Sequence, residues 1–427
     1  MNSRIRNCYD SHTHFLATGQ IAEGLQLREL KSASDVADLK IKPGHYRQQW
    51  LTGFGWDENS WQGAKLPTKK ILDDIFPNEP VIFSRIDGHS SWLNSCAIET
   101  YKSKDLIISA ASEKSGLLFE HEHFQALSLL PAYTSQQLEI FFETAQRIFN
   151  QAGFTHLRDL TMNLNEWLVL CDMQSRERLS VCVDAFVTAK TPLDLDTVLR
   201  EITEMKKSNS PYLRVHGVKI FVDGSLGSQT AFVSENYLDS NQGGSLLWAV
   251  EDIKNLLRKT WQAGFDVATH TIGDQAAHVV VMAAREVSAE GISGRLHLEH
   301  VEVLRGETVQ LMKPLHVTCH LQPSHWLSDR HWLKKTLSAE LCKNIFPWES
   351  LRKNKIPFFF GSDSPIEKPS LFTTRNALNE SAKNGVPALS EDWMKHHSHP
   401  DQNWTNSFTE LNNEKIIQVY FDGKPLI

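Results

Sequence analysis

The chain has 427 residues, a hydrophobic share of 41%, a charged share of 22% and a formal net charge of −7 at pH 7. This length allows one elaborated barrel or two to three smaller domains, and the composition is ordinary for a soluble globular enzyme. The negative charge and the lack of a long basic run argue against nucleic acid or an anionic membrane as a partner. No stretch of the sequence is apolar and long enough to span a bilayer.

The cysteines and the first residues point to a reducing compartment. The six cysteines are scattered and include no Cys-X-X-Cys pair: Cys8, Cys96, Cys171, Cys182, Cys319 and Cys342. Scattered thiols argue against a disulfide framework or a zinc ribbon. Residues 1–8 carry basic side chains but lack the apolar region of a secretion signal. We therefore expect a cytoplasmic protein.

Strand-like and helix-like segments alternate along most of the chain. A first strand is expected to end at Asp10-Ser-His-Thr-His14, and seven more apolar or β-branched runs follow at 154–157, 180–187, 213–222, 265–269, 296–298, 315–319 and 357–360. Segments with helical periodicity, such as 251–263 and 275–288, lie between most of them. This alternation implies a parallel sheet covered by helices, and eight parallel strands close a barrel. The sequence predicts an α/β fold, a (β/α)8 TIM-type barrel over residues 7–377.

Two segments lie outside the barrel pattern. The first, at about 40–135, separates the first strand from the second and holds aromatic-rich, strand-like runs at 50–56 and 80–89. Because a structureless loop of this size is improbable, we predict an inserted subdomain over the barrel mouth. The second, 378–427, is a polar tail with one expected strand near 415–421.

His12 and His14 are two residues apart on the first strand, so both side chains leave from the same face. Two imidazoles at a strand end can hold a metal ion. Further ligand types recur at later strand ends, namely Lys219, His270, His300 and Asp363. In a (β/α)8 barrel, residues at the carboxyl ends of the strands converge on one pocket.

Two other His-X-His pairs occur, at His121-Glu-His123 and at His397-Ser-His399. With 19 histidines in the chain, about one such pair is expected by chance. Both pairs lie in polar segments without a strand before them, and we interpret them as surface histidines.

Five motifs occur in order along the chain: Asp10-Ser-His-Thr-His-Phe15, Val218-Lys-Ile-Phe-Val-Asp-Gly-Ser225, Thr269-His-Thr-Ile-Gly-Asp274, Leu298-Glu-His300 and Gly361-Ser-Asp-Ser-Pro365. Together they resemble the amidohydrolase superfamily, specifically the YtcJ-like, amidohydrolase 3 type branch that includes N-substituted formamide deformylase. Stretches at 55–57, 87–95, 153–155 and 322–325 resemble that branch as well. The resemblance runs from about residue 8 to 377.

The resemblance implies a centre of two divalent ions, expected to be Zn²⁺. His12 and His14 would bind the buried ion, His270 and His300 the more exposed ion, and an N-carboxylated Lys219 would bridge the two. Asp363 would bind the first ion and move the proton of a metal-bridging hydroxide. The chemistry is sound, because two cations on one water supply hydroxide near neutral pH and an adjacent carboxylate can carry its proton.

Purely structural roles for these residues remain open at this point. Lys219 could instead pair with Asp223, His270 and His300 could be core histidines, and Asp363 could cap a helix. The relatives also carry a small β-sandwich, of which this chain shows only a reduced remnant at its two ends. Neither these alternatives nor the reduced β-sandwich removes a residue from the predicted set of metal ligands.

The resemblance and the aromatic content of the insert suggest six substrate-binding residues: Trp56, Asp57, His89, Trp92, Gln322 and His325. The alternative for Trp56, Asp57, His89 and Trp92 is that they form the core of the insert. No residue in the sequence identifies the substrate.

We expect a metal-dependent amidohydrolase that cleaves a C–N bond in an amide, N-acyl amine or N-formyl amine of small-molecule size. Two alternatives stay open. One is a mononuclear deaminase-like or cyclic-amide hydrolase of the same fold with an unmodified Lys219, and the other is a catalytically inactive binding protein. A homo-oligomer is compatible with the sequence.

Overall fold

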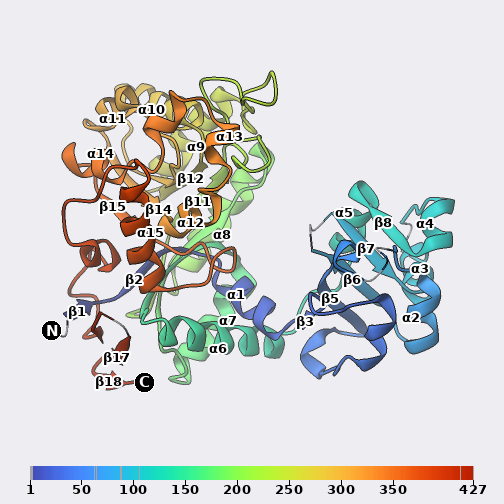
Figure 1. Ribbon diagram of the computed structural model, residues 1–427. Coiled ribbons are helices and arrows are strands. Elements are labelled where there is room, and N and C mark those ends of the chain that lie inside the picture. Colours follow the sequence, from blue (N-terminus) through green and yellow to red (C-terminus); the bar gives the residue numbers. More distant parts are fainter. Residues whose placement is uncertain are drawn as a thin grey trace. The chain divides into compact units, whose positions relative to one another are not determined.

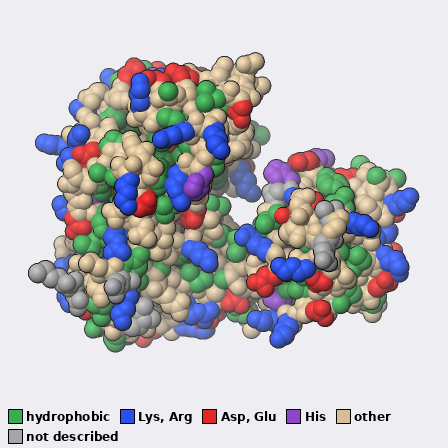
Figure 2. All heavy atoms as spheres, in the orientation of Figure 1, with side chains coloured by type: hydrophobic (Ala, Val, Ile, Leu, Met, Phe, Trp, Pro, Cys, Tyr) green, Lys and Arg blue, Asp and Glu red, His purple; other side chains and the backbone are tan. Residues whose placement is uncertain are grey.

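The computed structural model describes residues 3–426 except 62, 64, 87, 88, 105 and 414. The chain divides into two compact units, one made of Met1–Thr18 with Ala145–Ile427 and the other of Gly19–Thr144. No described helix has the length and apolar character needed to cross a membrane. On the face shown in Figure 2, basic and acidic side chains are interspersed.

The first unit is built on eight parallel strands, as predicted. In chain order they are β2 (Tyr9–Thr13), β9 (His156–Met162), β10 (Cys182–Thr188), β11 (Leu213–Phe221), β12 (Asp266–Thr271), β13 (Arg295–His300), β14 (His316–Leu321) and β15 (Phe358–Phe360). Each strand pairs with the next in the order β2-β9-β10-β11-β12-β13-β14-β15. All seven later strands lie at or within a few residues of the runs read from the sequence.

The chain directly after β15 closes the barrel against β2. Asp363 N donates to His12 O at 2.8 Å, and His14 N donates to Ser364 O at 2.8 Å. Thr13 and Ser364 form an isolated parallel bridge. These contacts place the end of the eighth strand beside the end of the first, which is where a metal centre shared by both must lie.

Helices cover the outside of the barrel (Figure 1). They are α1 (Phe15–Glu23), α6 (Ser135–Gln151), α7 (Leu164–Ser175), α8 (Leu195–Lys206), α9 (Val250–Gln262), α10 (Asp274–Ala289), α11 (Gly306–Met312), α12 (Pro323–Asp329), α13 (Leu333–Thr336), α14 (Trp348–Lys353) and α15 (Leu371–Lys383), with α1 and α6 each divided by the unit boundary. In α9 the buried side chains are Ile253, Leu256, Leu257, Thr260 and Trp261. Their spacing of three to four residues puts them on one face of the helix, which packs on the strands.

A small antiparallel sheet joins the two chain ends in the order β1-β16-β17-β18. Its strands are β1 (Ser3–Arg6), β16 (Phe408–Leu411), β17 (Ile416–Phe421) and β18 (Lys424–Pro425). The sequence pattern predicts one strand in the tail, whereas the structure has three. β16 and β18 are short and half polar, so they carry no apolar run of their own and depend on their partners for definition.

The second unit, Gly19–Thr144, contains the insert. Its sheet runs β3 (Leu25–Gln26), β5 (Trp50–Trp56), β6 (Val81–Arg85), β7 (Ser90–Leu93), β8 (Leu117–Phe119), with β4 (Tyr46–Arg47) paired to β5. Its helices are α2 (Lys69–Ile75), α3 (Ser95–Lys102), α4 (Ala110–Ser115) and α5 (Glu120–Ser128). The unit is therefore a folded subdomain, and its position over the barrel mouth stays a prediction. Short 3-10 turns complete the chain at Ala33–Asp38, Pro43–His45, Glu58–Ser60, Pro192–Asp194, Leu341–Asn344 and Trp393–His397.

Both faces of the insert's sheet are apolar, and Gly55 decides which face Trp56 joins. Trp50 belongs to one buried cluster, whereas Leu51 and Trp56 belong to the other. Trp50 and Trp56 would share a face in a regular strand, since they are six residues apart. A register shift between Phe54 and Trp56, with Gly55 at φ 106°, turns Trp56 to the opposite side.

Candidate metal centre

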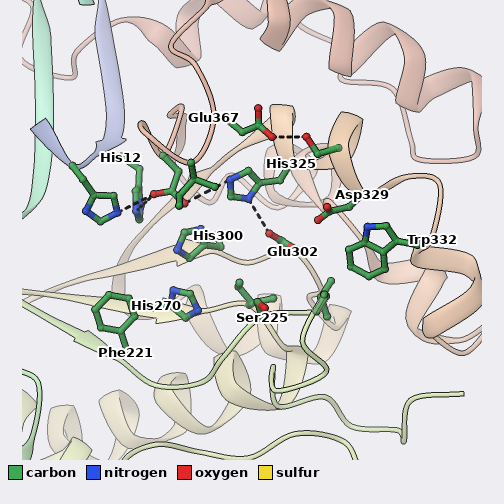
Figure 3. Close-up of a pocket in the computed structure, with 17 residues that line it drawn as sticks. His12, Phe221, Ser225, His270, His300, Glu302, His325, Asp329, Trp332 and Glu367 are labelled. Carbon is green, nitrogen blue, oxygen red and sulfur yellow. Dashed lines mark hydrogen bonds and ion pairs between the residues drawn. The ribbon is translucent and has the colours of Figure 1, made fainter. Parts of the chain in front are cut away.

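The predicted ligands lie together at the carboxyl ends of the barrel strands. A cavity of about 410 Å³ opens there. Five of the six predicted ligands line it: His12, His14, His270, His300 and Asp363. Lys219, the sixth, is buried on β11. In Figure 3, Trp332 lies on the opposite side of the cavity from His12.

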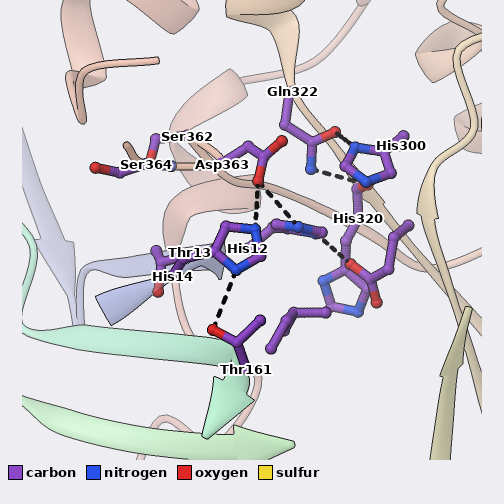
Figure 4. A network of polar contacts seen from close by, with 12 residues as sticks. His12, Thr13, His14, Thr161, His300, His320, Gln322, Ser362, Asp363 and Ser364 are labelled. Carbon is purple, nitrogen blue, oxygen red and sulfur yellow. Dashed lines mark hydrogen bonds and ion pairs between the residues drawn. The ribbon is translucent and has the colours of Figure 1, made fainter. Parts of the chain in front are cut away.

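Asp363 holds the two histidines of the first strand together. Its Oδ1 lies 3.2 Å from His12 Nε2 and 3.0 Å from His14 Nε2 (Figure 4). The ring centroids of His12 and His300 are 4.6 Å apart, and those of His270 and His300 are 4.5 Å apart. Four imidazoles and one carboxylate thus face a common space.

Each of the four histidines has one ring nitrogen bound to a protein group. His12 Nδ1 donates to Glu299 Oε2 at 2.7 Å, His300 Nδ1 to Gln322 Oε1 at 2.9 Å, and His270 Nε2 to Gly224 O at 3.0 Å. His14 Nδ1 hydrogen-bonds Thr161 Oγ1 at 3.2 Å. Metal-binding histidines are usually oriented in this way, and the second nitrogens of His12 and His14 face the carboxylate of Asp363. The residues therefore fit a metal centre.

Two groups of ligand atoms are compact enough to surround an ion. The first is His12, His14 and Asp363, and the second is His300, His325 and Asp363. Within each group the atoms lie within 4.8 Å of one another. Asp363 belongs to both groups, so its two carboxylate oxygens are placed between two candidate ion positions.

Two of these ligands have a strained backbone. His300 has φ 69° and Asp363 has φ 58°, in the left-handed region that side chains other than glycine rarely adopt. Such residues cost on the order of 1–3 kcal/mol each and concentrate at functional sites. The fold thus holds both side chains at the centre against a local energetic preference.

The model of the Amidohydrolase family matches residues 9–387. The chain belongs to the amidohydrolase family. It is 29% identical over 380 residues to YtcJ of Bacillus subtilis (strain 168), covering 84% of this chain and 69% of that protein. It is 26% identical over 389 residues to the protein LONG AFTER FAR-RED 3 of Arabidopsis thaliana, covering 84% and 65%. The chain thus spans about two thirds of the length of these relatives.

Two solved structures share the fold over most of this amidohydrolase. An uncharacterized metal-dependent hydrolase from Pyrococcus furiosus has a TM-score of 0.75 at 26% identity, covering 94% of this chain and 80% of that one. A second, from Pyrococcus horikoshii OT3, has a TM-score of 0.74 at 25% identity, covering 95% and 80%. Family and neighbours together make the chain a metal-dependent hydrolase of this superfamily.

Lys219 of this amidohydrolase is a buried amine without a hydrogen-bond partner. Its side chain is 1% exposed, and Nζ makes no hydrogen bond to any described residue. Burial lowers the pKa of Lys219 to about 8. Asp223, the partner that a structural role would need, instead accepts hydrogen bonds from the backbone N–H groups of Phe232, Ile272 and Gly273. Because an orphaned buried amine is costly, the position fits a lysine that is modified or in contact with a ligand.

Electrostatics favour the ligating forms of His270, His300 and Asp363. Burial, followed by the charge of Lys219, lowers the pKa of His270 to about 3. Burial and the neighbouring His270 hold the pKa of His300 well below its usual range. Burial alone would raise the pKa of Asp363, but the contacts with His12 and His14 bring it well below the usual range. Neutral imidazoles and an ionised carboxylate are the forms that bind a cation.

The sequence predicts a substrate-binding role for His325, and the structure places it at the ligand cluster. Its Nε2 lies 3.6 Å from Asp363 Oδ2, and its Nδ1 hydrogen-bonds Glu302 Oε1 at 3.0 Å. Burial opposes its ionisation, yet Glu302 raises the pKa of His325 to about 9. Gln322 is buried behind His300 rather than lining the cavity.

The four predicted substrate residues of the insert have partners within their own unit. Trp56 and Trp92 are buried, and their indole N–H groups donate to Phe83 O at 2.8 Å and Thr68 O at 3.0 Å. Asp57 lies 3.1 Å from Arg85, and the exposed His89 lies 3.1 Å from Glu120. Trp56 and Trp92 are therefore part of the hydrophobic core of the insert. A substrate-binding role for these four residues stays a prediction.

Other residues of the cavity were missed by sequence reasoning. They lie at or beyond the ends of the barrel strands: Phe221, Ser225, Leu226, Gly227, Ile272, Glu302, Ser328, Asp329, Trp332, Ile366 and Glu367. The available signal was position, since residues just beyond each strand's carboxyl end face the barrel mouth. Glu299 and Thr161, which orient His12 and His14, carried no comparable signal.

The interpretation of the other His-X-His pairs as surface residues is wrong for three of the four histidines. His123, His397 and His399 are all buried. His397 hydrogen-bonds Tyr9 O at 3.1 Å, and His399 lies 2.9 Å from Asp184. These partners are distant in sequence, so the polar local context gave no indication of burial.

Proposed function

We propose that this amidohydrolase cleaves the C–N bond of a small amide of the N-acyl or N-formyl amine type, using two divalent ions, in our proposal Zn²⁺. The observation that supports the proposal most is the convergence of His12, His14, His270, His300 and Asp363 on one cavity, with Asp363 Oδ1 placed against both His12 and His14. His12, His14 and Asp363 would hold one ion, and His270 and His300 the other. A carboxylated Lys219 would join them, which would also account for its unpartnered Nζ.

Bound divalent ions would acidify a water molecule and polarise the scissile carbonyl. Asp363 is the group suited to move the proton. One carboxylate oxygen takes the proton from the attacking water, the water oxygen bonds to the carbonyl carbon, and the C–N bond breaks as the proton passes to the nitrogen. The products are a carboxylic acid and an amine.

The cavity lining favours neutral or cationic substrates. Phe221, Leu226 and Trp332 supply apolar surface, while Glu302, Asp329 and Glu367 carry acidic groups. The described lining residues include neither lysine nor arginine. A substrate carboxylate would find no lysine or arginine here, and the cationic His325 of the lining is already paired with Glu302. Burial of a substrate carboxylate in this part of the site would therefore be costly.

A substrate panel tests the proposal. Purified protein loaded with Zn²⁺ should hydrolyse N-formyl and N-acyl derivatives of small apolar amines, and Asp363→Asn should lose that activity. N-acyl amino acids of the same apolar size should be poorer substrates. Turnover of cyclic amides or deamination of heterocycles, without any turnover of open-chain amides, would replace the proposal with the mononuclear alternative. Elemental analysis then decides between one and two ions per chain.

A further inference from the structure

A second cavity of about 580 Å³ occupies the barrel at the end opposite the metal centre. Its lining includes Asp184, Asp266 and Arg295, which lie at or near the first residues of β10, β12 and β13. It therefore opens at the amino-terminal ends of the strands. Residues at that end of a (β/α)8 barrel usually serve stability and not catalysis. The barrel interior is ordinarily filled by branched apolar side chains.

Here that interior is polar, and its two deepest acids already have histidine partners. His216 Nε2 lies 2.7 Å from Asp184 Oδ1, and His297 Nε2 lies 3.4 Å from Asp266 Oδ2. His399 also lies 2.9 Å from Asp184. The third acid of the lining, Asp401, lies 3.0 Å from Arg214. The acidic groups around the cavity thus have cationic or hydrogen-bonding partners of their own.

The donors are less well satisfied. Arg158 lines the cavity and is only 2% exposed. Its Nη1 donates to Glu299 Oε1 at 2.8 Å and to Ser11 O at 3.2 Å, but Nε and Nη2 make no hydrogen bond to any described residue. Buried donors of this kind are rare and require a ligand or water.

The free edge of Arg158 is the one that binds oxyanions. Nε and Nη2 form a planar fork whose two N–H groups match the two oxygens of a carboxylate or phosphate. Three other arginines use the same fork, and Arg85 binds Glu58 through it at 2.8 and 3.2 Å. Arg258 binds Glu290 through it at 2.7 and 2.6 Å, and Arg352 binds Glu349 at 2.8 and 3.0 Å.

We propose that this second cavity, called the lower cavity below, is a binding site for a small oxyanion, a carboxylate or a phosphate. The oxyanion would dock on the Nε–Nη2 edge of Arg158. Arg295, exposed at the mouth and without a described ion-pair partner, adds a second positive charge. The site is separate from the proposed hydrolytic site, yet Arg158 connects the two. One carboxylate oxygen of Glu299 accepts a hydrogen bond from Arg158 Nη1. The other accepts one from His12 Nδ1 at 2.7 Å.

Because Arg158 contacts both the oxyanion and Glu299, occupation of the lower cavity should alter the affinity of the metal centre. Linkage requires the reverse as well, so metal loading should change oxyanion affinity by the same factor. This reciprocity distinguishes a connected site from a passive water-filled cavity.

Titration calorimetry of the Zn²⁺-loaded protein with inorganic phosphate, and separately with acetate, tests the site. Chloride at matched ionic strength is the reference. The stronger binder of the two identifies the oxyanion. Arg158→Lys keeps the charge but loses the fork, and should weaken binding by about 10- to 100-fold. Arg295→Gln should weaken it by about two- to fivefold and leave turnover without added oxyanion unchanged.

Two further variants make the outcome decisive. Asp363→Asn perturbs the upper centre and should leave phosphate or acetate bound, which separates the lower cavity from anion binding at the metals. Arg285→Gln, an exposed arginine on α10 outside the cavity, should have no effect. Absence of saturable binding of either anion, or binding that neither Arg158→Lys nor Arg295→Gln weakens, would overturn the proposal.

Discussion

Glu299 and His12 form a buried pair directly beneath the metal centre, with Glu299 Oε2 2.7 Å from His12 Nδ1. Neither side chain is more than 1% exposed. The carboxylate fixes both the orientation and the tautomer of the imidazole, so that Nε2 points toward Asp363. The glutamate also neutralises Arg158, whose Nη1 lies 2.8 Å away.

We expect Glu299→Gln to weaken metal binding by about 10- to 100-fold, the range typical for loss of such an orienting partner. The amide can still accept from His12 Nδ1 but no longer balances Arg158. Metal affinity measured by competition with a chelator checks this. Glu251→Gln, on an exposed residue of α9, is the matched control. Unchanged affinity in Glu299→Gln would show that the pair is only structural.

Lys219 offers a test of metal count. If its carbamate bridges two ions, Lys219→Gln should bind about one ion per chain where the wild type binds two, because the amide cannot bridge. Bicarbonate in the preparation should raise metal occupancy of the wild type and leave the variant unchanged. Elemental analysis gives both results. Equal metal content in the two proteins would favour an unmodified Lys219 and the mononuclear alternative.

Trp56 and Trp332 form a matched pair of substitutions. Trp56 is fully buried in the insert. Trp56→Ala should destabilise that unit by about 3–5 kcal/mol, the usual cost of removing a buried large aromatic. Trp332→Ala, in the cavity lining, should instead raise KM for apolar amides with little loss of stability. Thermal unfolding and steady-state kinetics separate the two, and metal content should stay constant in both.

Much of this arrangement could be predicted from sequence because it depends on local periodicity. Short apolar or β-branched runs in the sequence predict most strands of the barrel. A histidine ligand lies at or near the end of three predicted strands: His12 and His14, His270, and His300. Position along a strand is a local property, and the barrel converts it into proximity. The five cavity-lining ligands came from that rule together with the family resemblance.

What could not be predicted depends on partners far apart in the chain. His12 meets Glu299, which is 287 residues away, and His397 meets Tyr9 across 388 residues. No local pattern distinguishes such a buried histidine from a surface one. The side-chain direction of Trp56 could not be predicted for a different reason, since a bulge at Gly55 sets it.

His216 should make stability depend on pH. Burial opposes its ionisation, but Asp184 and Asp266 raise its pKa from the ordinary 6.5 to about 9. A pKa raised in the folded state contributes stability that is fully present below pH 6.5 and is lost as the pH rises through about 9. His216→Gln should therefore lower Tm at pH 6, and the difference from wild type should shrink toward pH 10. A difference in Tm that does not vary with pH would exclude an ionic role for His216.

Asp363 is the residue at which metal binding and catalysis can be separated. It belongs to both ligand groups, and the backbone contact of its N–H with His12 O at 2.8 Å holds it beside the first strand. Asp363→Asn preserves shape and one ligating oxygen but cannot accept a proton. Loss of a general acid–base group costs on the order of 10²–10⁴-fold in rate.

We therefore expect kcat of Asp363→Asn to fall by about that factor while the fold and most of the metal remain. The acidic limb of the pH–rate profile should also disappear, because that limb reports protonation of the group that accepts the proton. Circular dichroism and elemental analysis confirm the intact protein, and Asp329→Asn, a carboxylate of the same cavity outside both ligand groups, is the control. Near-normal turnover in Asp363→Asn, or an acidic limb that persists in it, would assign the proton transfer to another group.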